Sequence, residues 1–317
     1  MANPTARLNF KAAMVQVSVP ATSANLGPGF DCFGLALDMR DRYAAQILDE
    51  PGFDIDISGE GADDVKKDKN NLVIRAMLRG FEHMGSKDFT GNKARGIALR
   101  QLNIIPHGRG LGSSAAAIVG GLALARALVL GGEQLMTDED LISLGSELEG
   151  HPDNVGAAVL GGATIAWTST DSIGSQIGHA VATKVDPRIK AIIFVPEAHL
   201  ATSKARKLLP ETISHHDAAL NSARTALLVH ALQSRPDLLL EATTDLLHQE
   251  YRTEAMPKTL ALVNKLRAAG VAAMVSGAGP SVLVLHTMDD LEVEEIMKVG
   301  AGSFTAQKVA ISPLGVE

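Results

Sequence analysis

A glycine-rich segment restricts the fold of this 317-residue chain more than any other feature of its sequence. It reads IPHGRGLGSSAA at residues 105–116, with glycines at three alternate positions. Glycines in this pattern allow the backbone to bend tightly and to bring its N–H groups close to a ligand. A helix is predicted from Ser114 to about Leu130, and a helix N-terminus carries unpaired N–H donors and a partial positive charge. Together with the hydroxyl groups of Ser113 and Ser114, these features predict a phosphate-binding loop.

Two better-known phosphate-binding loops are excluded by the spacing of the same residues. The P-loop pattern needs a lysine after its last glycine, and none follows Gly112. The dinucleotide pattern G-x-G-x-x-G is absent too, because the glycines here are spaced G-x-G-x-G. The alternative is a flexible connection between a strand and a helix, with a serine as the N-cap. Three glycines, two serines and a following helix favour phosphate binding over that alternative.

Hydrophobic periodicity predicts a mixed chain of strands and helices. Alternating or continuous apolar residues predict strands at 14–19, 33–48, 53–58, 96–104, 191–196 and 274–285, and one more after the paired glycines at 161–162. Helical spacing predicts helices at 71–84, 138–149, 203–209, 217–234, 236–251 and 257–269. The two kinds of element do not alternate strictly, which favours an α+β fold over a doubly wound sheet. Residues 1–13 are expected to form a loose extension, and the polar stretch 168–180 is interpreted as the boundary between two domains, 14–170 and 171–317.

Composition limits the class of partner and the compartment. Hydrophobic residues make up 46% of the chain and charged residues 21%, as in an ordinary globular protein, and the formal net charge is −7. An acidic chain repels phosphate backbones and anionic membranes, so we expect neither nucleic acid nor a membrane as a partner. The one cysteine, Cys32, excludes an internal disulfide framework and a Cys-rich zinc site. The N-terminus lacks the apolar core of a signal peptide, so a cytoplasmic protein is expected.

A second polar loop is predicted at residues 20–31, PATSANLGPGFD, directly after the first strand. Asn25 can both donate and accept hydrogen bonds, and the carboxylate of Asp31 could bind an ammonium group or orient a hydroxyl group. Thr22 and Ser23 could contact phosphate. The same composition is typical of a capped turn, and the residues alone do not decide between the two interpretations.

An acidic cluster, ELEGHPDN at residues 147–154, covers the end of a predicted helix. Phosphoryl transfer needs magnesium to neutralise phosphate charge, and a carboxylate commonly holds that ion. Glu149 is the candidate metal ligand, together with a hydroxyl group from Ser113 or Ser114, and Glu147 is the alternative. A solvent-exposed acidic helix end is the structural interpretation, which is strong for a single glutamate and weaker for the cluster.

The glycine-rich segment resembles the second motif of the GHMP kinases, the superfamily that includes galactokinase, homoserine kinase, mevalonate kinase and phosphomevalonate kinase. The segments at 20–31 and 275–281 (VSGAGPS) resemble the first and third motifs, so all three occur in the family order and span about 17 to 285 of the chain. The resemblance implies an ATP-binding N-terminal domain with the ribosomal protein S5 domain 2-like fold and a ferredoxin-like C-terminal domain. It also implies that ATP contacts the loop formed by Pro106, His107, Gly108, Arg109, Gly110, Leu111, Gly112, Ser113, Ser114, Ala115 and Ala116.

The first motif is similar to that of the homoserine kinase branch, whereas mevalonate and galactose kinases differ at these positions. This likeness implies that ATP phosphorylates L-homoserine to O-phospho-L-homoserine for threonine synthesis, with Mg²⁺ held by Glu149 and Ser114. It implies substrate contacts from Asn25, Asp31, His151, Thr202, Arg206, Arg252 and Gly277. Two of these are arginines, whose planar guanidinium groups suit the carboxylate of an amino acid. Asn25 and Asp31 are the candidate catalytic residues; Asp31 is the one candidate general base, and binding the substrate ammonium group is its alternative role.

Several points are left open by the sequence. Many members of the family have a longer segment between the glutamate and His151, so the choice between Glu147 and Glu149 is not settled. A GHMP kinase acting on another small alcohol, such as mevalonate, is the nearest alternative function. A non-catalytic ATP-binding regulator on the same fold is the second, and the intact Ser114 and Asp31 argue against it. The sequence is compatible with a homodimer and is silent on feedback inhibition by threonine.

Overall fold

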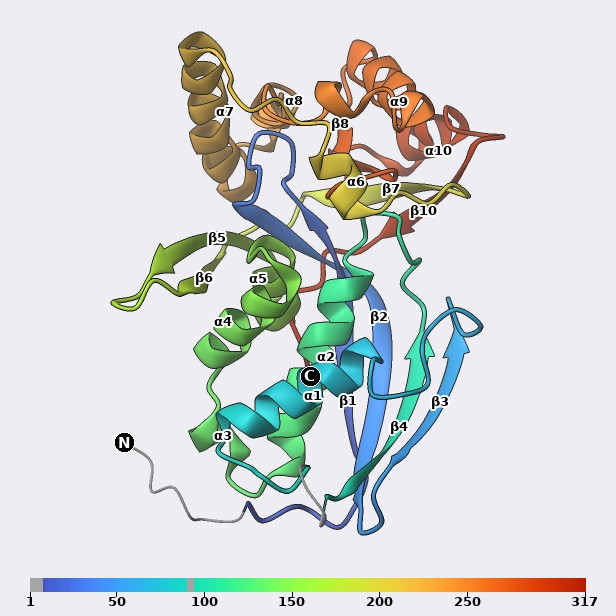
Figure 1. Ribbon diagram of the computed structural model, residues 1–317. Coiled ribbons are helices and arrows are strands. Elements are labelled where there is room, and N and C mark those ends of the chain that lie inside the picture. The colour runs from blue at the N-terminus through green and yellow to red at the C-terminus, as the bar shows by residue number, and fades with distance from the viewer. Residues whose placement is uncertain (1–7, 90–93) are drawn as a thin grey trace.

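Two β-sheets, each with its own helices, divide the chain into the lower and the upper part of Figure 1. The computed structural model describes residues 8–89 and 94–317. The first sheet has the strand order β3-β4-β2-β5-β6, with β1 paired to β2, and the second has the order β10-β7-β9-β8. Helices and strands do not alternate in a doubly wound pattern, so the predicted α+β class is confirmed.

The elements of the first part are β1 (Val15–Ala24), β2 (Phe33–Leu48), β3 (Phe53–Gly59), α1 (Leu72–His83), β4 (Gly96–Asn103), α2 (Ser113–Leu128), α3 (Gly132–Leu135), α4 (Asp138–Glu149), α5 (Asp153–Leu160), β5 (Ala163–Thr170) and β6 (Gln176–Thr183). Those of the second part are β7 (Lys190–Pro196), α6 (Thr202–Arg206), α7 (His215–Gln233), a 3₁₀ turn (Pro236–Leu238), α8 (Leu239–Ala242), a second 3₁₀ turn (Glu250–Arg252), α9 (Pro257–Ala268), β8 (Ala272–Val275), β9 (Val282–His286), α10 (Asp290–Lys298) and β10 (Phe304–Val309). The tail 310–317 returns to the first part, where Ile311 bridges Leu37.

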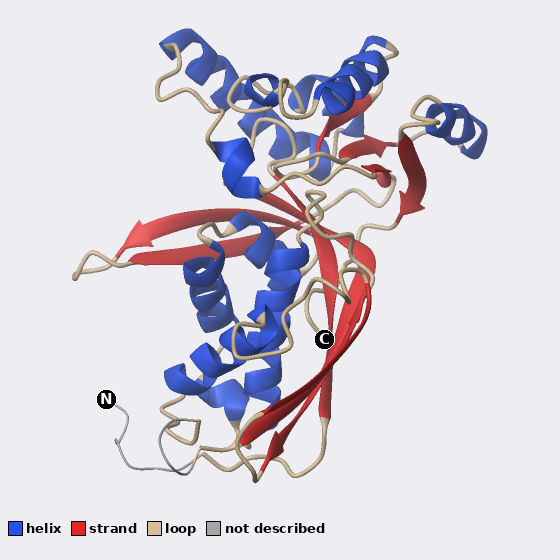
Figure 2. Cartoon of the chain, turned by 45° about the vertical axis from the view of Figure 1, so that its right-hand side comes forward, coloured by secondary structure: helices blue, strands red, loops and turns tan. Residues whose placement is uncertain are grey.

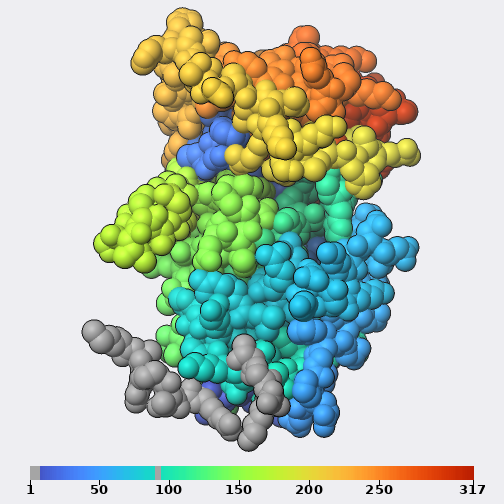
Figure 3. Space-filling model, viewed as in Figure 1, coloured from blue at the N-terminus to red at the C-terminus, as the bar shows by residue number. Residues whose placement is uncertain are grey.

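The 16-residue strand β2 is the spine of the first sheet. Its later residues, from Arg42 to Leu48, pair with β4, while its first residues, 33–35, pair with β5. Strand β1 pairs antiparallel with β2 along most of the length of β2. This long hairpin carries the loop between β1 and β2 to the junction with the second part. Figure 3 shows blue N-terminal chain there, between the green and the yellow segments.

Helix α2 is the centre of the first hydrophobic core. It is apolar on most of its surface, and its fully buried residues include Ala116, Leu122, Leu124, Ala125 and Leu128. A helix of this composition has to be covered all round, and it packs against β1 and β2 as well as α1 and α4 (Figure 2). Gly120 permits this closeness, because a Cβ there would lie 2.4 Å from the Tyr43 ring. Neither α2 nor any other helix within the described ranges is long and apolar enough to cross a membrane.

Five elements escaped prediction from the sequence: the four-residue α3, and α5, β6, α10 and β10. α5 has eight residues and ends at paired glycines, so it is too short for its periodicity to be distinguished from a loop. β6 is mostly exposed or half-buried, and α10 buries a single residue, Val293. Elements that bury so little of their surface lack the regular apolar pattern on which such predictions depend.

The single helix predicted at 236–251 is wrong. The segment is broken into 3₁₀ turns and the short α8. The carboxylate of Asp245 accepts hydrogen bonds from the backbone N–H groups of residues 247–249, which offers this stretch an alternative to helical bonding. The apolar run 274–285 likewise forms two strands, β8 and β9, because a turn at 276–281 interrupts it.

The expected domain boundary falls inside a hairpin. Position 170 is the last residue of β5, which pairs with β6 from Ala163 opposite Thr183 to the turn. The division into 14–170 and 171–317 therefore stays a prediction, and the pairing favours a boundary after Thr183 that keeps β6 in the first sheet.

The described part of the extension expected at 1–13 contacts the first core. Residues 1–7 lie outside the described residues. Phe10 forms an isolated bridge with Val129, and its ring packs edge-on against Phe81 with centroids 5.5 Å apart. These contacts attach the described part of the extension to the first core.

Replacing Leu122 by Ala tests the central position of α2. Leu122 is fully buried, so the cavity left behind should lower the free energy of unfolding by about 2–5 kcal/mol. Leu291→Ala is the matched control, because Leu291 on α10 is 76% exposed and should change stability by less than about 0.5 kcal/mol. Urea unfolding followed by circular dichroism measures both variants, and similar losses for the two would contradict this arrangement of the core.

Candidate active site

A cavity of about 140 Å³ opens where the loops of the two parts meet. The seven residues expected from the sequence to contact a substrate all line it: Asn25, Asp31, His151, Thr202, Arg206, Arg252 and Gly277. The candidate metal ligands Ser114 and Glu149 and four further residues of the glycine-rich loop also line it: Gly108, Gly110, Gly112 and Ser113. The fold thus brings together side chains as far apart in sequence as Asn25 and Gly277, which are 252 positions apart.

The glycine-rich loop has a backbone that only glycine adopts readily. Gly108, Gly110 and Gly112 have φ angles of 65°, 70° and 72°. A Cβ at Gly110 would lie 2.2 Å from the Ser276 carbonyl oxygen, and one at Gly112 would lie 1.9 Å from Oγ1 of Thr22. Helix α2 then begins without a side-chain cap, which leaves its first N–H groups for a ligand. The loop is therefore suited to bind an anion with its backbone amides.

Several side chains of this loop serve the structure and do not face the cavity. The guanidinium group of Arg109 donates to the carbonyl oxygens of Pro196 at 2.8 Å and Glu197 at 3.0 Å, which ties the loop to the end of β7. Leu111, Ala115 and Ala116 are buried core residues, and Pro106 lines no part of the cavity. Any contact of Arg109 with a phosphate would therefore come from its backbone N–H.

A second space, of about 240 Å³, adjoins the first and shares Ser113 and Ser114 with it. His107 lines this adjoining cavity, together with Tyr43, Val65, Asn71, Leu72, Val73, Gln101, Asn103 and Ala117. The start of α2 therefore lies between two adjoining spaces. An elongated ligand with its negative charge near the middle could occupy both.

Hydroxyl groups hold the three motif segments together. Ser276 Oγ lies 2.6 Å from the carbonyl oxygen of Gly110 and 2.8 Å from Oγ of Ser23. Oγ1 of Thr22 donates to Oδ1 of Asn154 at 2.8 Å. Thr22 and Ser23, considered as phosphate contacts from the sequence, are instead fully buried supports of the site.

The two candidate glutamates point to different places. Glu149 lines the cavity and accepts a hydrogen bond of 2.6 Å from Oγ of Ser114. Glu147 forms an ion pair of 3.0 Å with Arg79 at the surface. Burial raises the pKa of Glu149, although the hydrogen bond from Ser114 opposes the shift. Among residues 8–89 and 94–317, no group of three or more His, Cys, Asp or Glu side chains is arranged to hold a metal ion.

His151 forms a short contact with a buried carboxylate. Its Nδ1 lies 2.6 Å from Oδ1 of Asp153, which is 1% exposed. Burial disfavours the charged imidazole, but the hydrogen bond and charge of Asp153 together with the charge of Glu149 outweigh it and raise the pKa of His151. His151 therefore adds a donor or a positive charge beside Glu149.

The opposite wall carries a paired carboxylate and guanidinium. Arg206 donates two hydrogen bonds to Asp31, at 2.5 Å and 2.9 Å. Asn25 accepts the backbone N–H of Asp31 at 3.0 Å and donates to the Gly277 carbonyl oxygen at 2.8 Å. Asn25 and Asp31 have left-handed backbones, with φ of 71° and 55°, a conformation that costs free energy in residues other than glycine. The surrounding contacts hold this loop in a strained shape that presents Asp31 to the cavity.

An aromatic ring that the sequence did not single out supports both arginines. The guanidinium carbons of Arg206 and Arg252 lie 5.3 Å and 5.7 Å from the centre of the Phe30 ring. Phe30 stacks in turn on His248, with ring centroids 5.2 Å apart. Arg252 is 1% exposed, and burial followed by the nearby Arg206 lowers its pKa to about 10. Its Nε has no hydrogen-bond partner.

Sequence signals for these two supporting residues exist but are weak. Phe30 directly precedes Asp31 in the first motif, and His248 precedes Arg252 by four residues. The His248 ring contacts NH1 of Arg252 at 3.2 Å and the Gly27 carbonyl oxygen at 2.8 Å. Both residues therefore help to position groups that line the cavity.

Family models match both parts of the chain. The model of the GHMP kinase N-terminal domain matches residues 71–162, and that of the GHMP kinase C-terminal domain matches residues 224–298. With the fold and the site described above, they define the class: the chain is a GHMP kinase, and the two-domain fold expected of that superfamily is confirmed.

The similarity to individual proteins is more specific. Homoserine kinase of Streptomyces avermitilis is 44% identical over 308 residues, which cover 96% of each chain. Homoserine kinase of Streptomyces coelicolor is 47% identical over 290 residues, which cover 91% of this chain and 89% of its own. A crystal structure of homoserine kinase from Cytophaga hutchinsonii matches with a TM-score of 0.79 and 26% identity, over 98% of this chain and 99% of that one. The chain belongs to the homoserine kinase family.

Replacing His248 by Gln tests its burial beneath Phe30. Burial lowers the pKa of His248 below its usual 6.5, and Arg252 adds to this while Asp245 opposes it. The unfolded chain therefore binds the proton more readily, and stability falls as the pH drops below 6.5. The free energy of unfolding should decline with falling pH more steeply in the wild type than in His248→Gln. The difference between the two slopes should be at most about 1.4 kcal/mol per pH unit, the value for one proton.

The exposed His216 on α7 supplies the control for this measurement. His216→Gln should leave the pH dependence of urea unfolding as in the wild type. Equal pH slopes for the wild type and His248→Gln would contradict the buried, neutral state of His248.

Proposed function

We propose that this chain transfers the γ-phosphoryl group of ATP to the side-chain hydroxyl group of L-homoserine, giving O-phospho-L-homoserine for threonine synthesis. The observation that carries the proposal is the placement of one carboxylate, Asp31, and two guanidinium groups, Arg206 and Arg252, around the Phe30 ring. Homoserine is a zwitterion. Its ammonium group can pair with Asp31 while its carboxylate pairs with a guanidinium fork.

ATP is proposed to occupy both adjoining cavities. The triphosphate would lie against the N–H groups between Gly110 and Ser114, where the start of α2 favours negative charge. The nucleoside would extend into the 240 Å³ space beside His107 and Asn71. This arrangement directs the γ-phosphate toward the 140 Å³ cavity that holds Asp31 and the arginines.

The residues present fit a magnesium ion. Glu149 and Ser114 offer two oxygen ligands 2.6 Å apart beside the phosphate-binding loop, and Mg²⁺ in kinases commonly takes few protein ligands, with phosphate oxygens and water completing the shell. A cation there would favour the ionised form of Glu149, whose pKa burial raises. When bound, the ion neutralises charge on the β- and γ-phosphates.

Positioning is proposed to supply most of the rate acceleration, because the phosphoryl-transfer transition state is loose and needs little covalent help. Both oxygens of Asp31 are engaged by Arg206, which favours binding of the substrate ammonium group over proton abstraction. Asn25 holds the backbone of Asp31 and of Gly277, so its part is to fix the acceptor pocket. His151 contributes a donor beside the transferred group.

We also propose a compartment and an assignment of domains. The half-buried Cys32 has no second cysteine to pair with in the chain, which suits the reducing cytosol. The unit 14–170, extended through β6, would bind ATP, and the unit that follows would supply Arg206 and Arg252. The acceptor therefore binds where the two units meet.

An acceptor panel with coupled ADP detection tests the proposed substrate. L-Homoserine should be phosphorylated well, L-serine poorly and mevalonate hardly at all, because mevalonate has no ammonium group to pair with Asp31. Faster turnover of mevalonate would transfer the assignment to another GHMP-type activity. Binding of ATP without turnover of any acceptor would support a regulator in place of an enzyme.

Replacing Arg206 or Arg252 by Lys removes the bidentate fork but keeps the charge. The KM for homoserine should rise by about 10–100-fold, while the KM for ATP stays within about threefold, because both arginines line the proposed acceptor cavity and neither lines the space proposed for the nucleoside. Arg100→Lys is the control, since Arg100 pairs with Asp54 at the surface. A comparable rise in both KM values would remove the carboxylate-binding role.

Replacing Glu149 by Gln tests the choice between the two glutamates. The Mg²⁺ concentration that gives half-maximal rate should rise about tenfold, because a neutral amide is a poorer ligand than a carboxylate. Glu147→Gln carries the same chemical change two residues away and should leave the Mg²⁺ dependence unaltered, since the exposed pair with Arg79 contributes little. A shift in Glu147→Gln without one in Glu149→Gln would reverse the assignment.

A further inference from the structure

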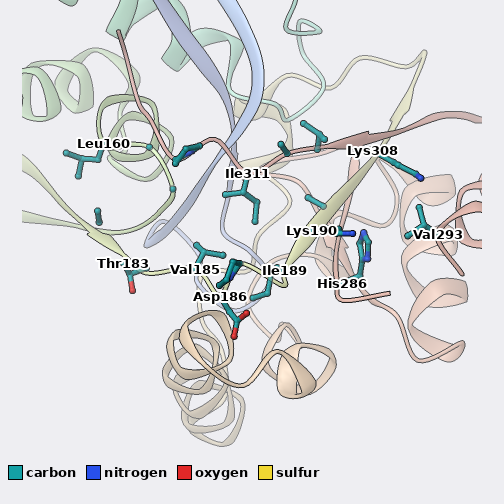
Figure 4. A pocket seen from close by; sticks show the side chains of 18 of the residues that line it. Leu160, Thr183, Val185, Asp186, Ile189, Lys190, His286, Val293, Lys308 and Ile311 are labelled. Atoms are coloured by element: carbon teal, nitrogen blue, oxygen red, sulfur yellow. The ribbon is translucent and has the colours of Figure 1, made fainter. Parts of the chain in front are cut away.

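Another cavity at the junction, of about 720 Å³, shares no lining residue with the candidate active site (Figure 4). Its walls come from both parts of the chain. The end of α5 and the segment 182–191 form one side, and β9, α10, β10 and the returning tail 310–313 form the other. Its volume lies within the roughly 300–1,000 Å³ of small-molecule sites.

Most of this lining is apolar. Leu160, Val185, Ile189, Val293, Ile311 and Pro313 all contribute to it. Figure 4 shows Val185, Ile189 and Ile311 arranged around one space. Apolar surface of this extent is stabilised when it is covered, so the cavity can accept an aliphatic group.

One edge of the cavity carries three basic side chains on three adjacent strands. They are Lys190 on β7, His286 on β9 and Lys308 on β10. Lys190 lies opposite His286 in the β7–β9 register, and Figure 4 shows the two side chains together. Burial, followed by the charges of Lys190 and Lys308, lowers the pKa of His286, so both ammonium groups are close enough to oppose a third positive charge. Nδ1 of His286 accepts the Met288 N–H at 3.2 Å, which leaves the proton of the neutral ring on Nε2.

The acidic residues of the cavity neutralise only part of this edge. Asp290 pairs with Lys308 at 3.5 Å, and Asp186 accepts three hydrogen bonds from Arg188, two from its guanidinium group and one from its backbone N–H. Within the described part of the chain, the ammonium group of Lys190 forms no ion pair with a carboxylate. Lys190 therefore leaves a positive charge beside an apolar space, in a chain whose net charge is −7. Its charge and shape are complementary to an anion with an apolar body.

We propose that this cavity binds a small amphipathic anion, with a carboxylate or phosphate group at Lys190, Lys308 and His286 and a short aliphatic chain against Val185, Ile189 and the other apolar residues. The site is separate from the kinase site and does not depend on the function proposed for it.

A ligand in this cavity would connect the two parts of the chain. The tail that forms one wall is hydrogen-bonded to β2, since Ala310 accepts the Asp38 N–H at 2.8 Å and Ser312 donates its N–H to Ala36 at 2.9 Å. Lys190 and His286 belong to the second sheet. A ligand that binds the folded chain but not the unfolded chain should therefore raise the thermal midpoint of unfolding, and the rise should grow with ligand concentration.

Titration of the full chain with four six-carbon probes tests the proposal. Hexanoate and hexyl phosphate should bind at millimolar concentrations and raise the thermal midpoint, and the tighter of the two identifies the preferred anion. Hexan-1-ol and hexylammonium, which have the same chain without the negative charge, should bind at least about tenfold more weakly. Calorimetry and thermal unfolding report binding without any assay of activity.

Variants distinguish this cavity from the kinase site, which also attracts anions. Lys190→Ala should weaken hexanoate binding about tenfold, and Ala182→Phe, at an exposed lining position, should block it. Lys265→Ala, an exposed lysine on α9 outside the cavity, and Arg206→Ala, in the kinase site, should leave binding unchanged. Binding that is absent in the wild type, equal for hexanol and hexanoate, or lost in Arg206→Ala but kept in Lys190→Ala would overturn the proposal.

Discussion

Close approach of three main-chain turns is the constraint on which the kinase site depends. Gly110 lies against the Ser276 carbonyl oxygen and Gly112 against Thr22, and in both places a Cβ would lie closer than 2.5 Å to its neighbour. Gly27 is equally close to its neighbour, since an added Cβ would lie 2.4 Å from the Thr243 carbonyl oxygen. Because the backbone approaches its neighbours so closely at these glycines, its amides and carbonyls can form the surface of the cavity, and long side chains are needed only where charge is required.

Charge is concentrated locally in a chain that is acidic as a whole. The start of α2 is one region suited to an anion, and the guanidinium groups of Arg206 and Arg252 form another, in a chain whose net charge is −7. Placing Arg252 out of water costs free energy, as its lowered pKa shows, and contact with the Phe30 face and with His248 offsets part of that cost. Asp31 balances one of the two guanidinium charges. A zwitterion can bind Asp31 with its ammonium group and a guanidinium group with its carboxylate, so the net charge of the site changes little. A simple anion cannot do this.

Local sequence was enough for the parts of the site that lie within one motif. The glycine spacing predicted a phosphate-binding loop, which stays a prediction, and resemblance supplied seven residues that line one cavity. The choice between Glu147 and Glu149 could not be made in this way, because residues two apart on a helix point about 200° apart and the orientation of α4 is set by its packing. Phe30 and His248 were missed for a related reason: an aromatic ring beside an arginine 222 residues later is a tertiary contact with no local signature. The broken segment 236–251 shows the same limit, since one carboxylate redirects its backbone hydrogen bonds.

The glycine-rich loop lies between two elements of the first part, but several of its hydrogen bonds go to residues of the second part. It connects β4 to α2, yet Arg109 fastens it to Pro196 and Glu197 at the end of β7, and Ser276 contacts its Gly110 carbonyl oxygen. Asp31 is likewise fastened to Arg206 of α6. The glycine-rich loop and the loop that carries Asp31 are therefore both attached to the second part of the chain. These polar contacts across the junction fix where the glycine-rich loop lies relative to Asp31 and Arg206, and the candidate site depends on that arrangement.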